Sequence, residues 1–307
     1  MQADECGDRG EAVEREGEIA ARRRLTVATH VLEPHLARTP ARGPLLHERG
    51  EAGLAHAAQV GEVDVGHVEV EDPHGAVAAA GHDVLVVAPS GERSGSGAAI
   101  GRLHRGGPIA CTEVHWPSLP GVPVYALDAP PAATVYAGFL GTFGAPPDAV
   151  ASGVNPGLNS GHLVLHSGTV GAALTAATLG LPAVAVSIAW HEHPRWATAA
   201  ALVPAALEWA LAGEGPVRVV NLNVPDVDLA DLRGVREARL APFMEQWTAA
   251  HQPGEVHLDY VGRAGEPPTG SDLALVLDGF AAVTTLVGLH PGEPAGAAGA
   301  IETGTRG

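Results

Sequence analysis

Three glycine-rich segments carry hydroxyl, amide and backbone groups that could bind a phosphate or a hard cation. The first covers residues 90–97 and holds the hydroxyls of Ser94 and Ser96 among glycines that let the backbone approach a ligand closely. The second covers residues 152–161, where Asn155 directly follows an apolar run and could present its amide carbonyl to an ion. Taken alone, a flexible surface loop or a plain turn would account for either composition.

The third segment covers residues 166–171 and opens an apolar, helix-like run. Ser167 can cap that helix, and the N–H groups of Gly168 and Thr169 would then point to one spot at the positive end of the helix dipole. Such a helix start is a phosphate-binding arrangement. A plain helix cap without a ligand would have the same residues.

The elements that must position these segments follow an α/β pattern from about residue 74. Short runs of Val, Ile, Leu and Ala, apolar on both faces, are typical of central parallel strands. They cover residues 84–89, 122–127, 149–152, 183–188 and 217–224, and helical patterns lie between them at 76–80, 134–141, 168–179 and 196–211. This alternation predicts a doubly wound, three-layer α/β domain over residues 74–225. Ligands bind at the carboxyl ends of such strands, so we expect the three segments to meet there.

The flanking regions follow this pattern less well. Residues 226–290 loosen into polar and turn-forming stretches, with candidate late strands at 273–277 and 281–289, and indicate a C-terminal extension. Residues 291–307 are rich in Gly, Ala and Pro, which predicts a disordered tail. Residues 1–73 mix Arg, Glu and His without a period and contain no apolar run of the kind that a buried strand needs. We expect that segment to be disordered or mistranslated.

Composition narrows the class of protein. The chain has 307 residues, 46% hydrophobic and 17% charged, which is a globular composition. Its 18 basic side chains, all arginine, face 35 acidic ones, and the net charge of -17 disfavours nucleic acid and anionic membranes as partners. Two cysteines exclude a disulfide scaffold, and the charged start of the chain holds no export signal, so we expect a cytoplasmic protein.

His191 and His193 could bind zinc, but without a third ligand nearby a surface loop explains them better.

Five sequence blocks, in this order along the chain, resemble those of the SurE family of stationary-phase survival proteins. They are residues 81–95 (GHDVLVVAPSGERSG), 152–159 (SGVNPGLN), 166–173 (HSGTVGAA), 183–187 (AVAVS) and 221–225 (NLNVP). The family consists of metal-dependent 5'-nucleotidases that act on nucleoside monophosphates. The resemblance covers residues 74–225, and more loosely the chain to about residue 290. It implies a Rossmann-like fold with a mostly parallel sheet, whose C-terminal extension makes dimer or tetramer contacts.

The resemblance also implies roles for residues in the three segments. Ser94 and Asn155 correspond to ligands of a divalent metal ion, Mg²⁺ or Mn²⁺. The residues that correspond to those beside the phosphate, or lining the same cleft, are Ser167, Gly168, Thr169 and Asn159. The expected ligand is a nucleoside monophosphate or another small phosphomonoester, and the expected assembly is a homo-oligomer.

One departure from the family pattern bears on activity. Members begin with a strand that ends in Asn-Asp-Asp-Gly, whose two Asp bind the ion, and this chain contains no such tetrapeptide. The usual interval before Pro89 leads to Glu62 and Asp64, which offer carboxylates but no convincing strand before them. Ser94 and Asn155 are neutral and would hold Mg²⁺ or Mn²⁺ weakly, so the sequence predicts low or no activity.

Two interpretations of function therefore stay open, and neither identifies a catalytic residue. One is a SurE-type 5'-nucleotidase that is impaired in this chain. The other is a non-catalytic nucleotide- or phosphate-binding protein that has lost its metal site. We also hypothesise that residues 1–73 come from a wrong reading frame or a misplaced start and replace the native first strand. If neither alternative frame of the upstream DNA encodes a strand followed by Asn-Asp-Asp-Gly, that hypothesis is wrong.

Overall fold

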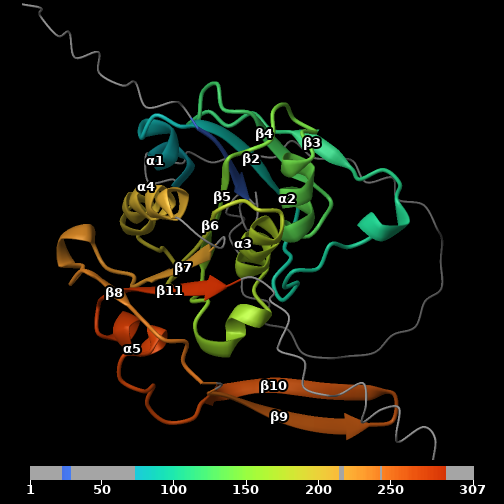
Figure 1. The fold of residues 1–307 in the computed structure, drawn as a ribbon. Coiled ribbons are helices and arrows are strands. Elements are labelled where there is room, and N and C mark those ends of the chain that lie inside the picture. The colour runs from blue at the N-terminus through green and yellow to red at the C-terminus, as the bar shows by residue number, and fades with distance from the viewer. Residues whose placement is uncertain (1–22, 29–72, 214–217, 243, 288–307) are drawn as a thin grey trace, which may run out of the picture.

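The computed structural model describes residues 23–28, 73–213, 218–242 and 244–287. Within them, a nine-stranded sheet forms the centre of the molecule, with helices on both faces (Figure 1). In spatial order the strands are β3 (Cys111–Glu113), β4 (Val124–Leu127), β2 (Asp83–Pro89), β1 (Arg24–Ala28), β5 (Ala149–Pro156), β6 (Ala183–Ile188), β7 (Arg218–Val224), β11 (Ala281–Val287) and β8 (Val235–Glu237). Neighbouring strands from β4 to β7 are parallel, while β3 and β11 pair antiparallel with β4 and β7. The predicted α/β fold with a mostly parallel sheet is confirmed.

Two pairs of helices complete the three layers. On one face α1 (Pro73–Ala79) packs against α4 (Trp196–Ala212), and on the other α2 (Pro131–Phe139) packs against α3 (Gly168–Thr178). Short 3-10 turns, η1 (Leu103–Arg105), η2 (Gly161–Leu165) and η3 (Leu229–Asp231), lie in the connections. Val77 and Leu207 are buried against the first face, and Val135 and Val170 against the second. No helix in the described residues is long and apolar enough to cross a membrane.

The prediction that no buried strand precedes residue 73 is wrong. Arg24–Ala28 form β1, which lies in the middle of the sheet between β2 and β5. Leu25 pairs with Val84 on one side and Ala149 on the other, and its side chain is fully buried. The run is only five residues long and starts on an arginine, so its apolar character is weak in the sequence. Its stability comes from ladders and packing on both sides, which are tertiary effects.

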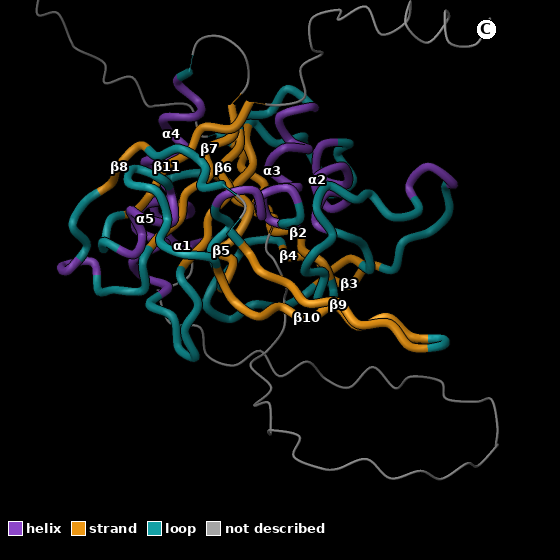
Figure 2. The backbone as a smooth tube through the Cα atoms, turned by 90° about the horizontal axis from the view of Figure 1, so that it is seen from below, coloured by secondary structure: helices purple, strands orange, loops and turns teal. Residues whose placement is uncertain are grey.

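The C-terminal extension differs from the sequence prediction in two places. Residues 273–277 were expected to form a strand but lie in helix α5 (Asp272–Leu277), while the predicted strand at 281–289 is confirmed as β11. A short apolar run fits either structure, and here Ser271 decides, because its side chain accepts a hydrogen bond from the Ala274 N–H and caps the helix. The turn-forming stretch contains a hairpin, β9 (Glu245–Gln252) and β10 (Glu255–Arg263), which projects from the body (Figure 2).

Candidate functional site

The first and third glycine-rich segments meet at the start of α3, as the sequence predicts. Gly171 lies so close to the loop after β2 that a Cβ there would be 2.2 Å from the carbonyl oxygen of Gly97. A Cβ at Gly168 would lie 3.0 Å from Ser96 Oγ. Only glycine permits this approach at residue 171, because the atom it meets belongs to the backbone. The loop after β2 that contains Ser96 and Gly97 therefore packs directly against the start of α3.

The start of α3 and the loop packed against it contain several hydrogen-bond donors. Ser167 is the N-cap, as predicted, and its Oγ accepts from the Val170 N–H at 3.1 Å. The first N–H groups of the helix, at Gly168 and Thr169, have no acceptor within the helix. The hydroxyls of Ser96 and Thr169 are buried and have no hydrogen-bond partner among the described residues. A buried hydroxyl without a partner is costly, so a ligand that accepts a hydrogen bond from either group would offset that cost.

Arg93 is a candidate that the sequence reasoning did not single out. Its Nη2 contacts the Asp128 carboxylate, and its Nε is buried without a partner in the described part of the chain. The carbonyl oxygen of Arg93 also faces Gly168, 3.6 Å from the position of a Cβ there. A basic residue next to Ser94 in a glycine-rich loop was the available signal. Arg93 brings positive charge to the loop, partly balanced by Asp128.

The second segment follows β5 and is anchored on the neighbouring strands. Asn155 is half-buried, and its Nδ2 donates to the carbonyl oxygen of Gly157 at 2.5 Å. Asn159 is buried, and its Nδ2 donates to Ser187 Oγ at 2.6 Å. Its backbone N–H donates to Asn223 Oδ1 at 2.8 Å, and its carbonyl oxygen accepts from Asn221 and Asn223. These bonds give Asn159 a structural part in holding the loop, and its predicted contact with phosphate stays a prediction.

The same loop is tied to the C-terminal extension through a buried carboxylate. Asp272 is fully buried, and its Oδ2 accepts from the Gly161 N–H at 2.7 Å. Its Oδ1 accepts from the N–H groups of Ala241 at 2.9 Å and Leu273 at 2.8 Å. One side chain thus connects the end of the glycine-rich loop with α5 and the segment before β9.

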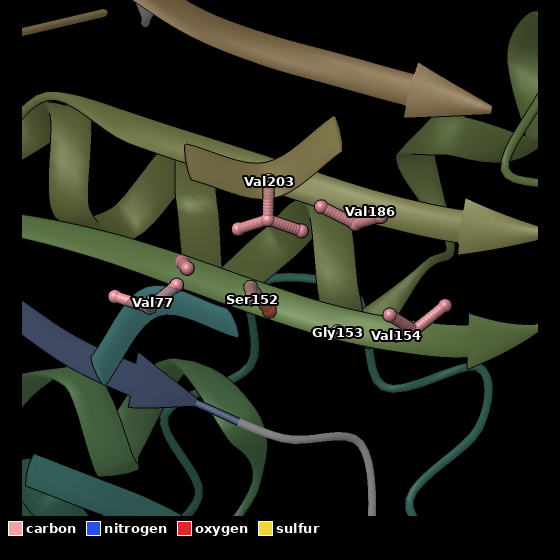
Figure 3. A pocket seen from close by; sticks show the side chains of 7 residues that line it. Val77, Ser152, Gly153, Val154, Val186 and Val203 are labelled. Atoms are coloured by element: carbon pink, nitrogen blue, oxygen red, sulfur yellow. The ribbon is translucent and has the colours of Figure 1, made fainter. Parts of the chain in front are cut away.

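A small cavity under β5 is a packing gap. Gly153 has φ +129°, and a Cβ there would lie 2.3 Å from the Val186 carbonyl oxygen, so only glycine fits between β5 and β6. The cavity beside it has a volume of about 10 Å³ and is lined mainly by valines, including Val77 and Val203 (Figure 3). Space for at most one water molecule and apolar walls exclude it as a ligand site.

The residues that would hold the metal are neutral. Ser94 follows β2 and Asn155 lies near the end of β5, and β1 runs between these two strands. At about 4.8 Å per strand, β2 and β5 are about 10 Å apart, so an ion between them would lie at the end of β1. The sequence after Ala28 reads Thr29, His30 and does not supply a carboxylate pair.

The described residues contain no further side chains that would complete this metal site. In the described ranges, no group of three or more His, Cys, Asp or Glu side chains could hold a metal ion. Glu62 and Asp64 lie outside the described residues. Mg²⁺ and Mn²⁺ give up hydration water mainly to anionic oxygens, and a hydroxyl with an amide carbonyl does not meet that demand. The described residues therefore do not fit the divalent ion that the resemblance implies.

The chain is similar in sequence to proteins of one known family. The family model "Survival protein SurE" matches residues 70–247, more than half of the chain. The chain belongs to the SurE family. Its sequence is 34% identical over 212 residues to a protein named "5'-nucleotidase SurE" from Synechococcus sp. (strain JA-3-3Ab), covering 67% of this chain and 81% of that relative.

Further similarities are to other SurE proteins. The chain is 36% identical over 214 residues to a protein named "5'/3'-nucleotidase SurE" from Serratia proteamaculans (strain 568), covering 66% of this chain and 79% of the relative. Its fold is similar to the crystal structure of the SurE protein from Aquifex aeolicus, with a TM-score of 0.65 at 20% identity. That match covers 91% of this chain and 99% of the other and supports the Rossmann-like architecture.

Proposed function

We propose that this SurE protein is a 5'-nucleotidase that hydrolyses nucleoside monophosphates to a nucleoside and phosphate, and that the reaction is impaired in the chain as it stands. Family membership and the names of the relatives support the reaction. The observation that carries it in this structure is the pair of buried hydroxyls, Ser96 and Thr169, at the start of α3, which have no hydrogen-bond partner among the described residues.

These groups would bind the phosphate through hydrogen bonds. The N–H groups of Gly168 and Thr169 and the two hydroxyls donate to non-bridging oxygens, while Ser167 keeps the helix start in place. Donors that are fixed before the reaction stabilise charge that develops on those oxygens. Asn159 would hold the neighbouring loop in position. No described residue is assigned as the nucleophile or its base.

The residues expected to bind the metal set the rate that we propose for this chain. In the SurE family a divalent ion supplies a Lewis acid and an activated water. Ser94 and Asn155 are the predicted ligands, and as neutral groups they do not fit that ion without further carboxylates. We therefore expect low or no turnover with Mg²⁺ or Mn²⁺.

This neutral donor set also favours a second candidate function. A protein that keeps the phosphate-binding helix start but lacks the ion would bind nucleotide or phosphate without hydrolysing it. The two candidates differ in what the ion does, because binding through α3 alone needs no metal.

The test combines turnover with binding. Phosphate release from adenosine 5'-monophosphate is measured with Mn²⁺ and with EDTA, and the same pair of conditions is used in titration calorimetry. The impaired nucleotidase shows slow, Mn²⁺-dependent release, and the binding protein shows nucleotide affinity that is indifferent to Mn²⁺ or EDTA. Release at the rate of a competent metallophosphatase contradicts the impairment, and no affinity for nucleotide or phosphate contradicts both candidates.

We further propose that the chain assembles as a homo-oligomer through the β9–β10 hairpin. Val256, Leu258 and Tyr260 alternate along β10 and share one face with Trp247, which pairs with Tyr260, and all four are exposed. An exposed apolar face on a two-stranded ribbon is typical of an interaction surface. Light scattering after size exclusion should give a dimer or tetramer, and the Val256→Ser/Leu258→Ser variant should give a monomer. A monomeric wild-type protein contradicts this assembly.

A further inference from the structure

An open cavity lies at the carboxyl ends of β6 and β7. Its volume is about 540 Å³, within the range of roughly 300–1,000 Å³ that is typical of small-molecule sites. The lining includes His191, His193, Arg195, Thr198, Asp228 and Leu229. Nothing in the resemblance or in the proposed phosphate site uses these residues.

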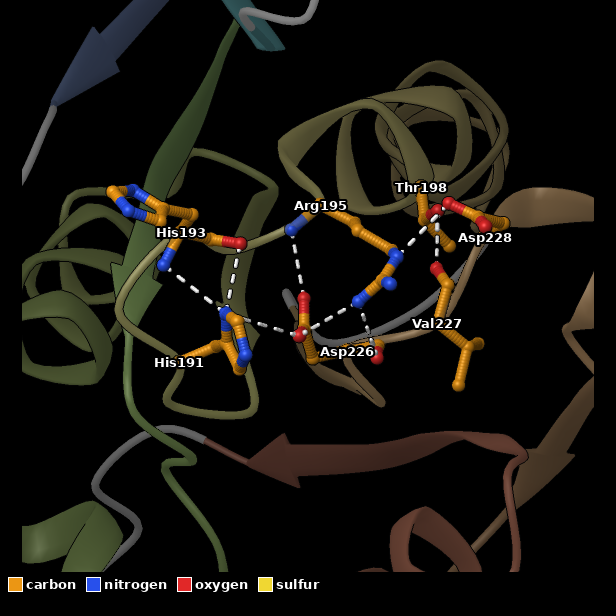
Figure 4. Close-up of polar contacts among 7 residues, drawn as sticks. All are labelled: His191, His193, Arg195, Thr198, Asp226, Val227 and Asp228. Carbon is orange, nitrogen blue, oxygen red and sulfur yellow. Dashed lines mark hydrogen bonds and ion pairs between the residues drawn. The ribbon is translucent and has the colours of Figure 1, made fainter.

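The walls of the cavity are fixed by a network of ion pairs and hydrogen bonds (Figure 4). Arg195 donates to Asp226 from its backbone N–H at 2.7 Å and from Nη1 at 3.1 Å, and its Nε donates to Asp228 Oδ1 at 2.9 Å. Thr198 Oγ1 donates to the Val227 carbonyl oxygen at 2.7 Å. The segment after β7 is thereby clamped to the start of α4, and the cavity is preformed.

The cavity is a neighbour of the loop that carries Asn155. The Gly157 N–H donates to the Ile188 carbonyl oxygen at 2.8 Å, and the Ala189 N–H donates to the Val224 carbonyl oxygen at 2.8 Å. The cavity residues therefore leave the sheet from β6 and β7, about 5 and about 10 Å from β5. The cavity and the loop that carries Asn155 both lie at the carboxyl edge of the sheet, where ligands of such folds bind.

The charges of the cavity disfavour a second phosphate. Arg195 already faces two carboxylates, Asp226 and Asp228, so no uncompensated positive charge of this cluster is left for an anion. The other features suit a neutral ligand: Leu229 is 53% exposed and offers an apolar surface, and His193 offers an exposed aromatic ring. Asp228 has a second carboxylate oxygen that can accept hydrogen bonds from sugar hydroxyls, as an acidic residue does in dinucleotide sites.

We propose that this cavity is the nucleoside subsite of the protein, with Leu229 and His193 against the base and Asp228 near the ribose hydroxyls. The proposal rests on the proposed function, because it takes the phosphate of the same ligand to lie at the start of α3. It assigns selectivity for nucleotides over simple phosphate esters to residues that follow β6 and β7.

The test compares ligands with and without a nucleoside by titration calorimetry. The variants are His193→Ala and Leu229→Ala, and Leu277→Ala, another exposed leucine, is the matched control. We expect each cavity variant to weaken binding of adenosine 5'-monophosphate about fivefold or more and to leave binding of inorganic phosphate unchanged. Leu277→Ala should change neither.

Two results would overturn the proposal: unchanged affinity for the nucleotide in both cavity variants, or an equal loss for nucleotide and phosphate. Failure of the proposed function looks different, since the wild-type protein would then bind no inorganic phosphate. In that case adenosine alone is the probe. Adenosine binding that is lost in Leu229→Trp, which fills the cavity, supports the subsite, and no adenosine binding overturns it.

Discussion

The proposed phosphate site and the proposed metal site differ in how well the described residues suit their ligands. At the phosphate side, Gly168 and Gly171 admit the loop after β2 at contact distance, and two hydroxyls are buried with nothing in the described residues to bond. At the metal side, Ser94 is exposed, Asn155 uses its amide nitrogen within its own loop, and no carboxylate pair follows β1. The comparison indicates that a fold can keep the packing around a proposed anion site while the residues expected to bind the ion have changed.

The largest effect is expected where the phosphate side is most tightly packed. Gly171→Ala places a methyl group 2.2 Å from a backbone oxygen, so the loop or α3 must move. We expect a loss of about 3 kcal/mol in the free energy of unfolding, as for an overpacked core. Gly213→Ala is the control, because φ there is -66° and the nearest atom is 3.5 Å from the added Cβ. Equal urea midpoints for the two variants would show that the loop does not rest on the helix as described.

The second prediction adds charge to the metal side. Thr29 and His30 directly follow β1, so Thr29→Asp/His30→Asp adds two carboxylates immediately after that strand. More anionic ligands raise affinity for a hard cation, and we expect Mn²⁺ affinity to rise about tenfold, measured by calorimetry. The neutral pair Thr29→Asn/His30→Asn has nearly the same shape and should give no rise. A similar rise in both variants would show that charge is not what the site lacks.

The third prediction separates binding from stability on the phosphate side. Ser96→Ala and Thr169→Val each remove a buried hydroxyl, and each should weaken phosphate binding about fivefold, since one hydrogen bond contributes about 1 kcal/mol. Because these hydroxyls lack partners in the described residues, their removal should leave the melting temperature equal or higher. Thr112→Val on the exposed strand β3 is the control. A lower melting temperature with unchanged phosphate affinity would contradict their assignment to the anion.

The smallest expected effect concerns the edge of the sheet outside the cleft. Cys111 is exposed, but partial desolvation by its surroundings, and then the negative charge of Glu113, raise the pKa of its thiol above its usual value. A raised pKa lowers the thiolate fraction at neutral pH and slows alkylation. Glu113→Gln removes one cause, so in a Cys6→Ser background iodoacetamide should label Cys111 about twofold faster. If the labelling rate of Cys111 is unchanged by Glu113→Gln but changes when phosphate is added, its reactivity is coupled to the proposed phosphate site instead.

The sequence predicts the parallel sheet and the cap of α3 by Ser167 because both follow from local patterns. Apolar runs on both faces mark central strands, and a serine before a glycine-containing helix start marks a cap. Strand β1 could not be predicted in this way, since Leu25 is stabilised by neighbours from β2 and β5 rather than by its own run. Likewise, nothing around Arg195 in the sequence indicates Asp226 and Asp228 as its partners, which come from another strand end.

Through Asp272, the C-terminal extension helps to hold the glycine-rich loop of residues 152–161 in place. If the protein were shortened after residue 225, the Gly161 N–H would lose the carboxylate oxygen that now accepts it at 2.7 Å. The loop that carries Asn155 and Asn159 would then have one fixed point fewer, with no change in any residue that touches a ligand. Residues 74–225 thus contain the candidate binding groups but not everything that keeps them in register, and an engineered minimal domain would need to retain α5.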